Sequence, residues 1–215
     1  MSDGITFTCA LRSGASYHAD DVRRLGRAIG RNFSPSKPVE FRPLTDVEGC
    51  GEPLLHDWPG WWSLIECFRI PGPAMFVGLD TVIVDTLDPL HEFILDLPED
   101  EFAMIRPFNK DRAHGQWASG ITCWNGDWSW IYDEFMEDPE KHINEFVMEQ
   151  KFTCDRLQRA GVKVHEIQDH ISGIYSFKHD CYGSLPKDAR IVLFHGEPRL
   201  SEAVCVVPWV KEHWR

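Results

Sequence analysis

Residues 74–88 read Ala-Met-Phe-Val-Gly-Leu-Asp-Thr-Val-Ile-Val-Asp-Thr-Leu-Asp, and this stretch favours a buried sheet. Two apolar runs, 75–79 and 82–84, enclose one carboxylate, Asp80. Continuous hydrophobic runs of this kind are typical of strands that are buried on both faces. A buried ionisable group is costly unless something pairs with it. Asp80 is therefore either a simple cap of the turn between two strands or part of a ligand or metal site at a strand end.

The N-terminal part of the chain predicts a strand–helix–strand unit. Residues 5–11 are predicted to be a strand, 19–32 an amphipathic helix, and 39–44 a second strand. This order favours a mostly parallel α/β sheet flanked by helices. Because ligands of open α/β sheets bind beyond the carboxyl ends of the strands, Asp46 and Asp80 are candidate ligand-binding residues.

Further elements follow from periodicity and from turn residues. We predict a short helix at 61–68, strands at 74–79, 81–85, 120–124, 162–167 and 189–194, an irregular segment at 98–120, and two helices within 129–160. In the second of these helices the apolar face consists of Ile143, Phe146, Val147, Cys154 and Leu157. Gln150 is predicted at the centre of that face and Glu149 off it. The amide is then either a hydrogen-bonded core group or a group that points into a site.

Composition limits the classes of function. The 215 residues are 43% hydrophobic and 26% charged, an ordinary globular balance that predicts a single domain over 1–215. The formal net charge of −12 disfavours nonspecific nucleic-acid binding, and four arginines on the 19–32 helix are interpreted as a solvated face. Seven cysteines without CxxC spacing, no visible signal peptide and no run long enough to span a bilayer predict a cytoplasmic protein with reduced thiols.

A second polar motif follows the strand predicted at 189–194. It reads His195-Gly196-Glu197-Pro198-Arg199. Imidazole nitrogen and carboxylate oxygen are both good ligands for a divalent metal such as Mn²⁺. Gly196 allows a backbone amide to approach a phosphate, and Arg199 offers a fixed bidentate charge for phosphate oxygens. We therefore expect Asp80 and His195 to converge on one site for a metal and a diphosphate.

These motifs, in this order, resemble those of nucleotide-sugar glycosyltransferases of the GT-A fold, especially glycosyltransferase family eight and its small bacterial and phage relatives. The resemblance covers nearly the whole chain. The matching segments are Cys9-Ala10-Leu11-Arg12-Ser13-Gly14 with Tyr17, Leu44-Thr45-Asp46, Gly60-Trp61-Trp62-Ser63, Phe76 to Val84, Ser119-Gly120-Ile121 and Phe194 to Arg199. The resemblance implies a Rossmann-like sheet, a Mn²⁺ or Mg²⁺ ion and a nucleotide diphosphate sugar as donor, which we expect to be UDP-linked.

The resemblance also implies roles for individual residues. It assigns the nucleoside to Cys9, Ala10, Leu11, Arg12, Tyr17 and Asp46, the sugar to Ser119, Gly120 and Gln150, the diphosphate to Gly196 and Arg199, and the metal to Asp80 and His195. The chain also departs from the family pattern. Gly78 replaces the first Asp of Asp-x-Asp, Leu64 a Lys, Ala118 an Asn, Glu149 an Asp, and Arg199 the final Lys. Because the first carboxylate is missing, metal binding is expected to be weaker.

The leading functional prediction is transfer of a sugar from a nucleotide diphosphate sugar to a hydroxyl acceptor. The stereochemistry is open; inversion would use a carboxylate base, for which Glu149 and Asp127 are the candidates. A second hypothesis is a binding module that holds a nucleotide, a sugar or a protein partner without turnover. A third is a phage-type enzyme that glycosylates a nucleic-acid base or a host protein, although the acidic charge argues against a DNA acceptor. In a fourth, an unrelated α/β protein, Asp80 and His195 would lie far apart.

Overall fold

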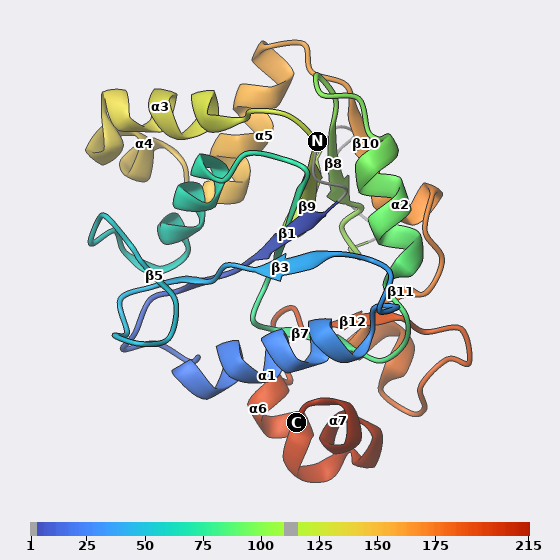
Figure 1. Ribbon diagram of the computed structural model, residues 1–215. Coiled ribbons are helices and arrows are strands. Elements are labelled where there is room, and N and C mark those ends of the chain that lie inside the picture. Colours follow the sequence, from blue (N-terminus) through green and yellow to red (C-terminus); the bar gives the residue numbers. More distant parts are fainter. Residues whose placement is uncertain (1–3, 110–115) are drawn as a thin grey trace.

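The computed structural model describes residues 4–109 and 116–215, and its centre is a six-stranded sheet (Figure 1). The strand order is β10-β8-β9-β6-β1-β3. These strands are β1 (Ile5–Thr8), β3 (Val39–Phe41), β6 (Ala74–Val77), β8 (Phe102–Ile105), β9 (Ala118–Trp124) and β10 (Val164–Glu166). β1 runs parallel to β3 and β6, and β10 runs parallel to β8. Only β9 is antiparallel to its neighbours β6 and β8, so the predicted mixed, mostly parallel sheet is confirmed.

Strand β6 is buried on both faces, as its sequence predicts. Its alternate side chains enter two different hydrophobic clusters because successive residues of a strand point to opposite faces. Met75 and Val77 pack into a cluster with α1 (Ala19–Arg31) and α2 (Asp88–Asp96). Ala74 and Phe76 pack into the other cluster, which also holds residues of the 3₁₀ helix η1 (Gly60–Arg69) and of the helices α3 (Ser129–Glu137) and α5 (Glu149–Arg159). Figure 1 shows these two groups of helices on different sides of the sheet.

Two small sheets extend this core. One has the order β11-β12-β7, formed by β11 (Ile174–Ser176), β12 (Ile191–Leu193) and β7 (Thr81–Ile83). The other is parallel and has the order β2-β4-β5, formed by β2 (Ala10–Leu11), β4 (Leu44–Thr45) and β5 (Glu52–Pro53). β7 and β12 are antiparallel, with Thr81 opposite Leu193. This pairing brings the start of β7 beside the end of β12.

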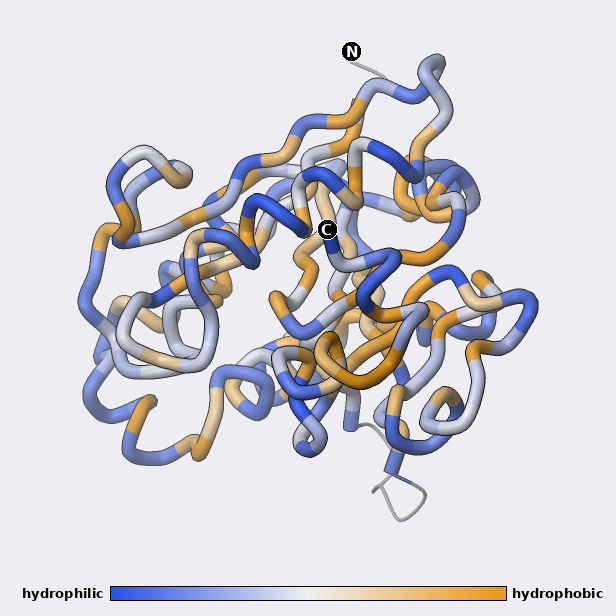
Figure 2. Tube along the Cα trace, turned by 90° about the horizontal axis from the view of Figure 1, so that it is seen from below, coloured by the Kyte–Doolittle hydropathy of each residue, from blue (hydrophilic) through white to orange (hydrophobic). Residues whose placement is uncertain are grey.

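The C-terminal helices α6 (Leu200–Val206) and α7 (Pro208–His213) pack beside α1. Arg31 donates hydrogen bonds to the carbonyl oxygens of His213 and Arg215, and Trp214 is buried. Figure 2, which views the molecule from below, shows the C-terminus in the middle of this face. None of the helices in the described part of the chain is long and apolar enough to cross a membrane. All seven cysteines are free thiols.

Several predicted elements differ from the observed ones. The strand predicted at 5–11 is divided at Cys9 into β1 and β2, and the strand predicted at 39–44 is divided into β3 and β4. The prediction that 98–120 is irregular is wrong, because β8 and the start of β9 lie within it; residues 110–115 lie outside the described residues. β8 has only four residues and lies between polar segments that contain proline, so its sequence is too short to show the period of a strand.

The region 129–160 contains three helices instead of two. Besides α3 and α5 it holds α4 (Pro139–Glu145), which ends before Phe146. The break at 146–148 changes the rotational phase of the following helix. As a result Val147 is 74% exposed, Glu149 is buried and Gln150 is half-buried. The predicted positions of Val147, Glu149 and Gln150 relative to the apolar face are therefore wrong.

Candidate functional site

The candidate site lies at the carboxyl ends of the parallel strands β1 and β6. β9 is antiparallel to β6, so its first residues lie at the edge where β6 ends. The amide of Gly78 donates to the carbonyl oxygen of Gly120 at 2.8 Å. Gly78, Asp80, Ser119 and Gly120 consequently share one edge of the sheet. This is the position in which open α/β sheets bind ligands.

Asp80 and His195 are brought together by the pairing of β7 with β12. The amide of Phe194 donates to the carbonyl oxygen of Asp80 at 2.8 Å, which extends the ladder by one bond beyond the strands. The two sequence motifs that follow buried strands therefore meet, as their sequence predicts. The alternative of an unrelated fold with these residues far apart is excluded.

The Asp80 side chain turns back toward Gly78. A Cβ atom at Gly78 would lie 2.6 Å from Oδ1 of Asp80 and 3.3 Å from the carbonyl oxygen of Gly120. The space next to the strand that a first carboxylate of an Asp-x-Asp pair would enter is thus taken by Asp80 itself. Burial raises the pKa of the Asp80 carboxyl to about 6, because its surroundings penalise the charged form.

His195 is held on two sides. Its Nε2 and the Oγ of Ser176 form a 2.8 Å hydrogen bond, and its ring stacks on Phe108 with centroids 5.2 Å apart. Burial lowers the pKa of His195 to about 4, and the positive charges of Lys178 and His179 lower it further, against the opposing effect of Asp180. The ring is therefore neutral at physiological pH, which leaves it able to accept a hydrogen bond or to bind a metal.

Arg199, at the start of α6, meets the N-terminal segment that contains Ser16 and Tyr17. Arg199 Nη1 donates to Ser16 Oγ at 2.6 Å. The pKa of Tyr17 is raised to about 12 by burial and by the charge of Asp80, with Arg199 acting in the opposite sense. Tyr17 is thus an electrostatic neighbour of both Asp80 and Arg199, although the three residues come from distant parts of the sequence.

Lys178 is a further cation of this site that the sequence did not reveal. It lies in η3 (Phe177–Cys181), which directly follows β11. β11 pairs with β12 so that Ser176 is opposite Leu193, and this register carries Lys178 to the loop after β12. A Cβ atom at Gly196 would lie 3.3 Å from Lys178 Nζ. No local sequence signal marks Lys178, because only the strand register places it there.

The residues expected to hold the nucleoside lie around β2 and β4. Ser13 donates to both carboxylate oxygens of Asp46, from its amide at 2.8 Å and from its hydroxyl at 2.6 Å. Burial opposes ionisation of Asp46, but these hydrogen bonds and the nearby charge of Arg12 outweigh it, so the pKa of Asp46 is lowered. Arg12 also pairs with Asp57. Asp46 therefore fixes the 12–14 loop and already uses both of its oxygens.

Cys9 and Leu11, which are expected to hold the nucleoside, belong to the hydrophobic core in this structure. Their side chains are only 0% and 1% exposed, because both enter the core cluster beneath the sheet. Burial also raises the pKa of the Cys9 thiol well above its usual range. Cys9 and Leu11 are thus buried as whole residues and offer no exposed surface to a ligand in this structure. Ala10, between them, is half-buried.

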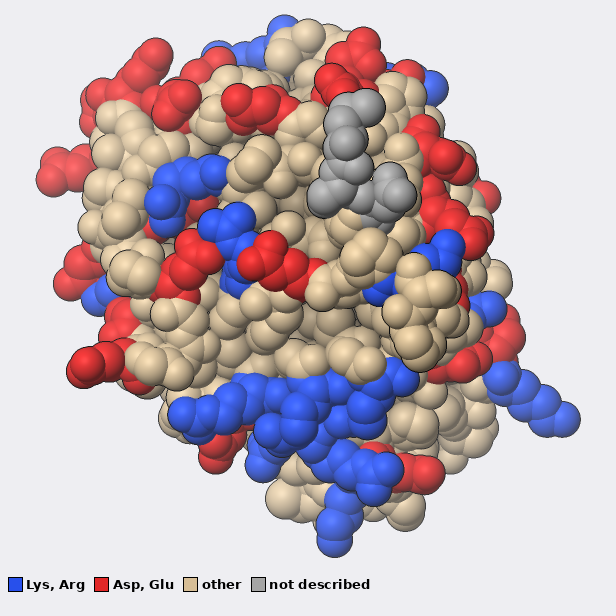
Figure 3. Space-filling model, viewed as in Figure 1, with Lys and Arg blue, Asp and Glu red and all other residues tan. Residues whose placement is uncertain are grey.

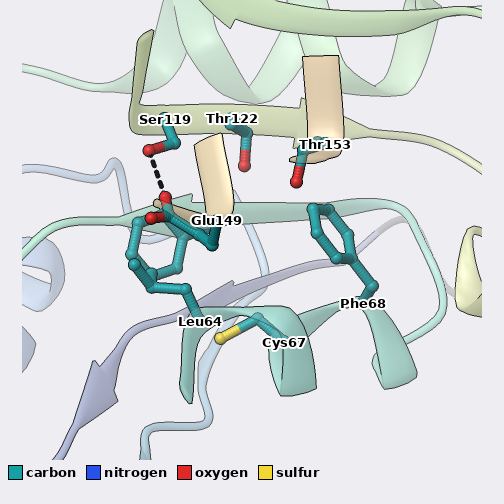
Figure 4. A pocket seen from close by; sticks show the side chains of 8 residues that line it. Leu64, Cys67, Phe68, Ser119, Thr122, Glu149 and Thr153 are labelled. Atoms are coloured by element: carbon teal, nitrogen blue, oxygen red, sulfur yellow. Dashed lines mark hydrogen bonds between the residues drawn. The ribbon is translucent and has the colours of Figure 1, made fainter. Parts of the chain in front are cut away.

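Glu149 and Gln150 both reach Ser119, from the first turn of α5. The hydroxyl of Ser119 donates to Glu149 Oε1 at 2.5 Å, and its amide donates to Gln150 Oε1 at 3.2 Å. Figure 4 shows the Ser119–Glu149 contact at the side of a small pocket lined by Leu64 and Thr153. The cavity measures about 10 Å³, which is space for about one water molecule. This pocket is too small for a sugar, and burial raises the pKa of Glu149 to about 7.

Asp127 is not part of the site. Ser119 is near the start of β9 and Trp124 is at its end, so five residue steps, roughly 17 Å of strand, separate the two edges of the sheet. Asp127 follows Trp124 at the far edge. Its Oδ1 accepts from the amide of Ser129 at 2.9 Å, at the start of α3. The structure therefore does not bring Asp127 together with the other candidate site residues; here Asp127 stabilises a helix start.

The basic residues of α1 form a separate surface. Figure 3 shows Lys and Arg gathered in a band over this helix, whereas Asp and Glu are spread over the rest of the face. Arg23 and Arg24 pair with Asp20 and Asp21, one turn earlier. Arg31 binds backbone carbonyls of the C-terminal segment. These contacts agree with a solvated, internally paired helix face.

Comparisons with known proteins identify the fold. No protein-family model matches the sequence, and no curated protein matches it. Among solved structures, galactosyltransferase LgtC, determined in complex with donor and acceptor sugar analogues, is similar with a TM-score of 0.60 at 12% identity, over 97% of this chain and 93% of that one. Glycosyltransferase GlyE of Streptococcus pneumoniae TIGR4 gives 0.61 at 14% identity, over 91% of this chain but only 55% of its own. The bifunctional glycosyltransferase WbbM gives 0.59 at 11% identity, over 98% of this chain and 51% of its own. The chain therefore has the GT-A fold over nearly its whole length.

Proposed function

We propose that this GT-A protein is a glycosyltransferase that takes a sugar from a nucleotide diphosphate sugar and passes it to a hydroxyl acceptor. The observation that carries the proposal is the convergence of Asp80 and His195, through the Phe194–Asp80 hydrogen bond, at the ligand-binding edge of a GT-A sheet. Tyr17 and Arg199 adjoin the same place. Binding of a nucleoside diphosphate requires polar groups for the base and a positive charge for the phosphates. In this proposal the 12–14 loop faces the base, and Arg199, close to Gly196, supplies the positive charge.

In this reaction the largest change of charge occurs on the diphosphate leaving group, which becomes more negative. The acceptor oxygen forms a bond to the anomeric carbon, the bond from that carbon to the diphosphate breaks, and the electron pair stays on the diphosphate. The hydroxyl proton passes to a base or to solvent. Arg199 stabilises the charge that develops on the diphosphate.

The remaining residues bind and orient the donor. In this proposal Tyr17, Arg12, Asp46 and the half-buried Ala10 hold the nucleoside, with uridine as the expected base. Gly196 admits a phosphate close to the backbone. Ser119, Gly120 and Gln150 face the sugar, whereas the buried Glu149 orients Ser119 instead of contacting substrate.

The divalent metal that the resemblance implies does not fit the residues present. Asp80 and His195 are the two candidate ligands, and within residues 4–109 and 116–215 no three His, Cys, Asp or Glu side chains gather as a metal-binding group. Position 78 offers no carboxylate, and Asp80 turns into that space. The positive charge of Lys178 acts on His195 and opposes a cation there. The proposed reaction therefore does not use a metal ion.

Ligand binding and turnover provide the test. UDP, GDP, ADP and their common sugar conjugates are screened by thermal shift, followed by an assay for released nucleoside diphosphate. A specific ligand at one hundred times its Kd stabilises the native state by about 2.7 kcal/mol, so one nucleotide series should raise the melting temperature. If none of these ligands binds or is turned over, with or without Mn²⁺, the proposal is wrong.

The binding module without turnover remains a second candidate because of three replacements at the site. Gly78, Leu64 and Ala118 stand where the family pattern has Asp, Lys and Asn. Leu64 now lines the small pocket next to Glu149. Tight binding of a nucleotide sugar that is never cleaved, in the presence of varied hydroxyl acceptors, would favour this candidate over the enzyme.

A further inference from the structure

Lys178 occupies an unusual position for a lysine, against the backbone of the loop that follows β12. Its Nζ lies 3.3 Å from the point where a Cβ of Gly196 would be. Gly196 has φ +79°, a backbone conformation that residues other than glycine rarely adopt. The ammonium group therefore lies against Gly196 on the side that a Cβ would occupy, and Gly196 itself is exposed.

The charge of Lys178 is not neutralised locally. Lys178 is half-buried, and no described residue forms a hydrogen bond or an ion pair with its ammonium group. Asp180, the nearest acidic residue in sequence, instead accepts a 2.9 Å hydrogen bond from the amide of Ser176. A partly buried ammonium group without a partner is costly, and an anion bound beside Gly196 would supply that partner.

A second cation, Arg199, belongs to the same segment of the chain as Gly196. Arg199 follows Gly196 by three residues and is anchored by its 2.6 Å hydrogen bond to Ser16. The segment that matches the Asp-x-Asp motif has a single carboxylate, Asp80, because residue 78 is glycine. Lys178 and Arg199 are therefore two positive charges at the loop after β12, the loop in which the family pattern carries a metal-binding His and a phosphate-binding Lys.

We infer that Lys178 and Arg199 together bind the diphosphate of the donor, and that nucleotide binding to this protein does not require a divalent cation. The inference rests on the proposed function and extends it to the way the phosphate charge is balanced. Two cations can offset the charge of the bound diphosphate and then of the leaving group, which is the task a metal performs in other sites.

The test is calorimetry with UDP, GDP and ADP, each compared with its nucleoside, in excess EDTA and then in Mn²⁺. For the nucleotide that binds, EDTA should change the Kd by less than about threefold. Lys178→Met removes the charge and keeps the aliphatic stem; it should weaken binding of the diphosphate about tenfold to a hundredfold and leave binding of the nucleoside unchanged. Lys187→Met, the same change at an exposed lysine of the 182–188 segment, is the matched control and should leave both affinities unchanged.

A complementary variant restores the missing carboxylate. Gly78→Asp would displace the Asp80 carboxylate, whose Oδ1 lies 2.6 Å from the new Cβ, and would place two acids at the site. Mn²⁺ should then strengthen diphosphate binding to Gly78→Asp by a larger factor than to the native protein. Circular dichroism verifies that each variant is folded.

Two different results separate the inference from the function on which it rests. If a nucleoside diphosphate binds only with Mn²⁺, or if Lys178→Met binds it as well as Lys187→Met does, the inference is overturned and the proposed function stands. If no nucleoside diphosphate binds under either condition, both are overturned.

Discussion

The Ser119 hydroxyl and the Glu149 carboxylate share a 2.5 Å hydrogen bond that joins the first residues of β9 to the first turn of α5. This contact fixes the helix start against the ligand-binding edge of the sheet, and Gln150 is held beside it through the amide of Ser119. Because Glu149 is only 4% exposed, the bond belongs to the protein interior more than to an open substrate site.

Replacing this carboxylate should change the pH dependence of stability. The folded pKa of Glu149 is about 7, above the ordinary value of 4.5, so the folded state holds the proton more tightly than the unfolded state. The native protein should therefore lose stability as pH rises from about 4.5 to 7. Glu149→Gln keeps an acceptor for Ser119 without the charge, and should be more stable than the native protein at pH 8 by on the order of 2–3 kcal/mol.

Urea unfolding of the two proteins at pH 4.5 and at pH 8 measures this difference. The gain from Glu149→Gln should nearly vanish at the lower pH. Glu145→Gln, at an exposed position of α4, is the control and should show no gain at either pH. An equal gain at both pH values would mean that the effect is not the titration of Glu149.

Asp80→Asn should stabilise the ligand-free protein. Burial raises the folded pKa of Asp80 from 3.8 to about 6, so the ionised carboxylate destabilises the ligand-free protein above that pH. Since Asp80 keeps some solvent exposure, we expect a gain of about 1–2 kcal/mol at pH 8 instead of the full value that the shift implies. In the metal-free mechanism proposed above Asp80 takes no catalytic step, so the transferase activity of the variant should stay close to that of the native protein.

Thermal unfolding and a nucleotide-release assay measure both effects. Asp85→Asn, an exposed aspartate just after β7, serves as the control and should stay within about 0.5 kcal/mol of the native protein with normal activity. A loss of stability in Asp80→Asn at pH 8 would contradict the destabilising charge.

The sequence predicts the parts of this fold that depend on local apolar pattern. The buried runs before Asp80 and His195 identify two strands, and the polar motif after each strand identifies the two chain segments that meet at the site. Lys178 is not predictable in this way, because its place next to Gly196 depends on the register of β11 with β12. Long-range register leaves no local period in the sequence.

The error over Glu149 and Gln150 has a similar origin. A single helix through 143–157 would place Gln150 on the apolar face, but the chain leaves the helix at 146–148 and begins α5 at a different phase. No proline or glycine marks this break. The separation of Asp127 from the other candidate residues depends on the antiparallel direction of β9, which no local pattern in the sequence marks.

Asp127→Ala tests this separation. The variant removes the acceptor for the amide of Ser129 and should cost about 0.5–1 kcal/mol of stability, as other lost helix-start contacts do. Its affinity for a nucleoside diphosphate and its transferase activity should equal those of the native protein. Chemical unfolding and calorimetry measure the two properties. Weaker nucleotide binding by a fully folded Asp127→Ala would return Asp127 to the site.

Glu66 is the buried acid whose loss should damage the fold most. Its side chain is 0% exposed, and its carboxylate accepts hydrogen bonds from the amides of Leu55 and His56 at 2.8 and 3.0 Å and from Arg69 at 3.0 Å. Glu66→Ala leaves these donors without a partner, so we expect a loss of about 3–5 kcal/mol.

The same variant should loosen the loop that precedes η1. Leu55 and His56 lie directly before Asp57, the partner of Arg12, which we propose to hold the nucleoside. Limited proteolysis should therefore cut the 52–59 segment faster in Glu66→Ala than in Glu66→Gln, which keeps one carbonyl acceptor, or in Glu48→Ala, an exposed control. Urea unfolding gives the stability of all three variants. A Glu66→Ala protein within about 1 kcal/mol of the native one would show that the carboxylate does not hold this loop, because breaking a buried, hydrogen-bonded charge network is among the costliest single substitutions.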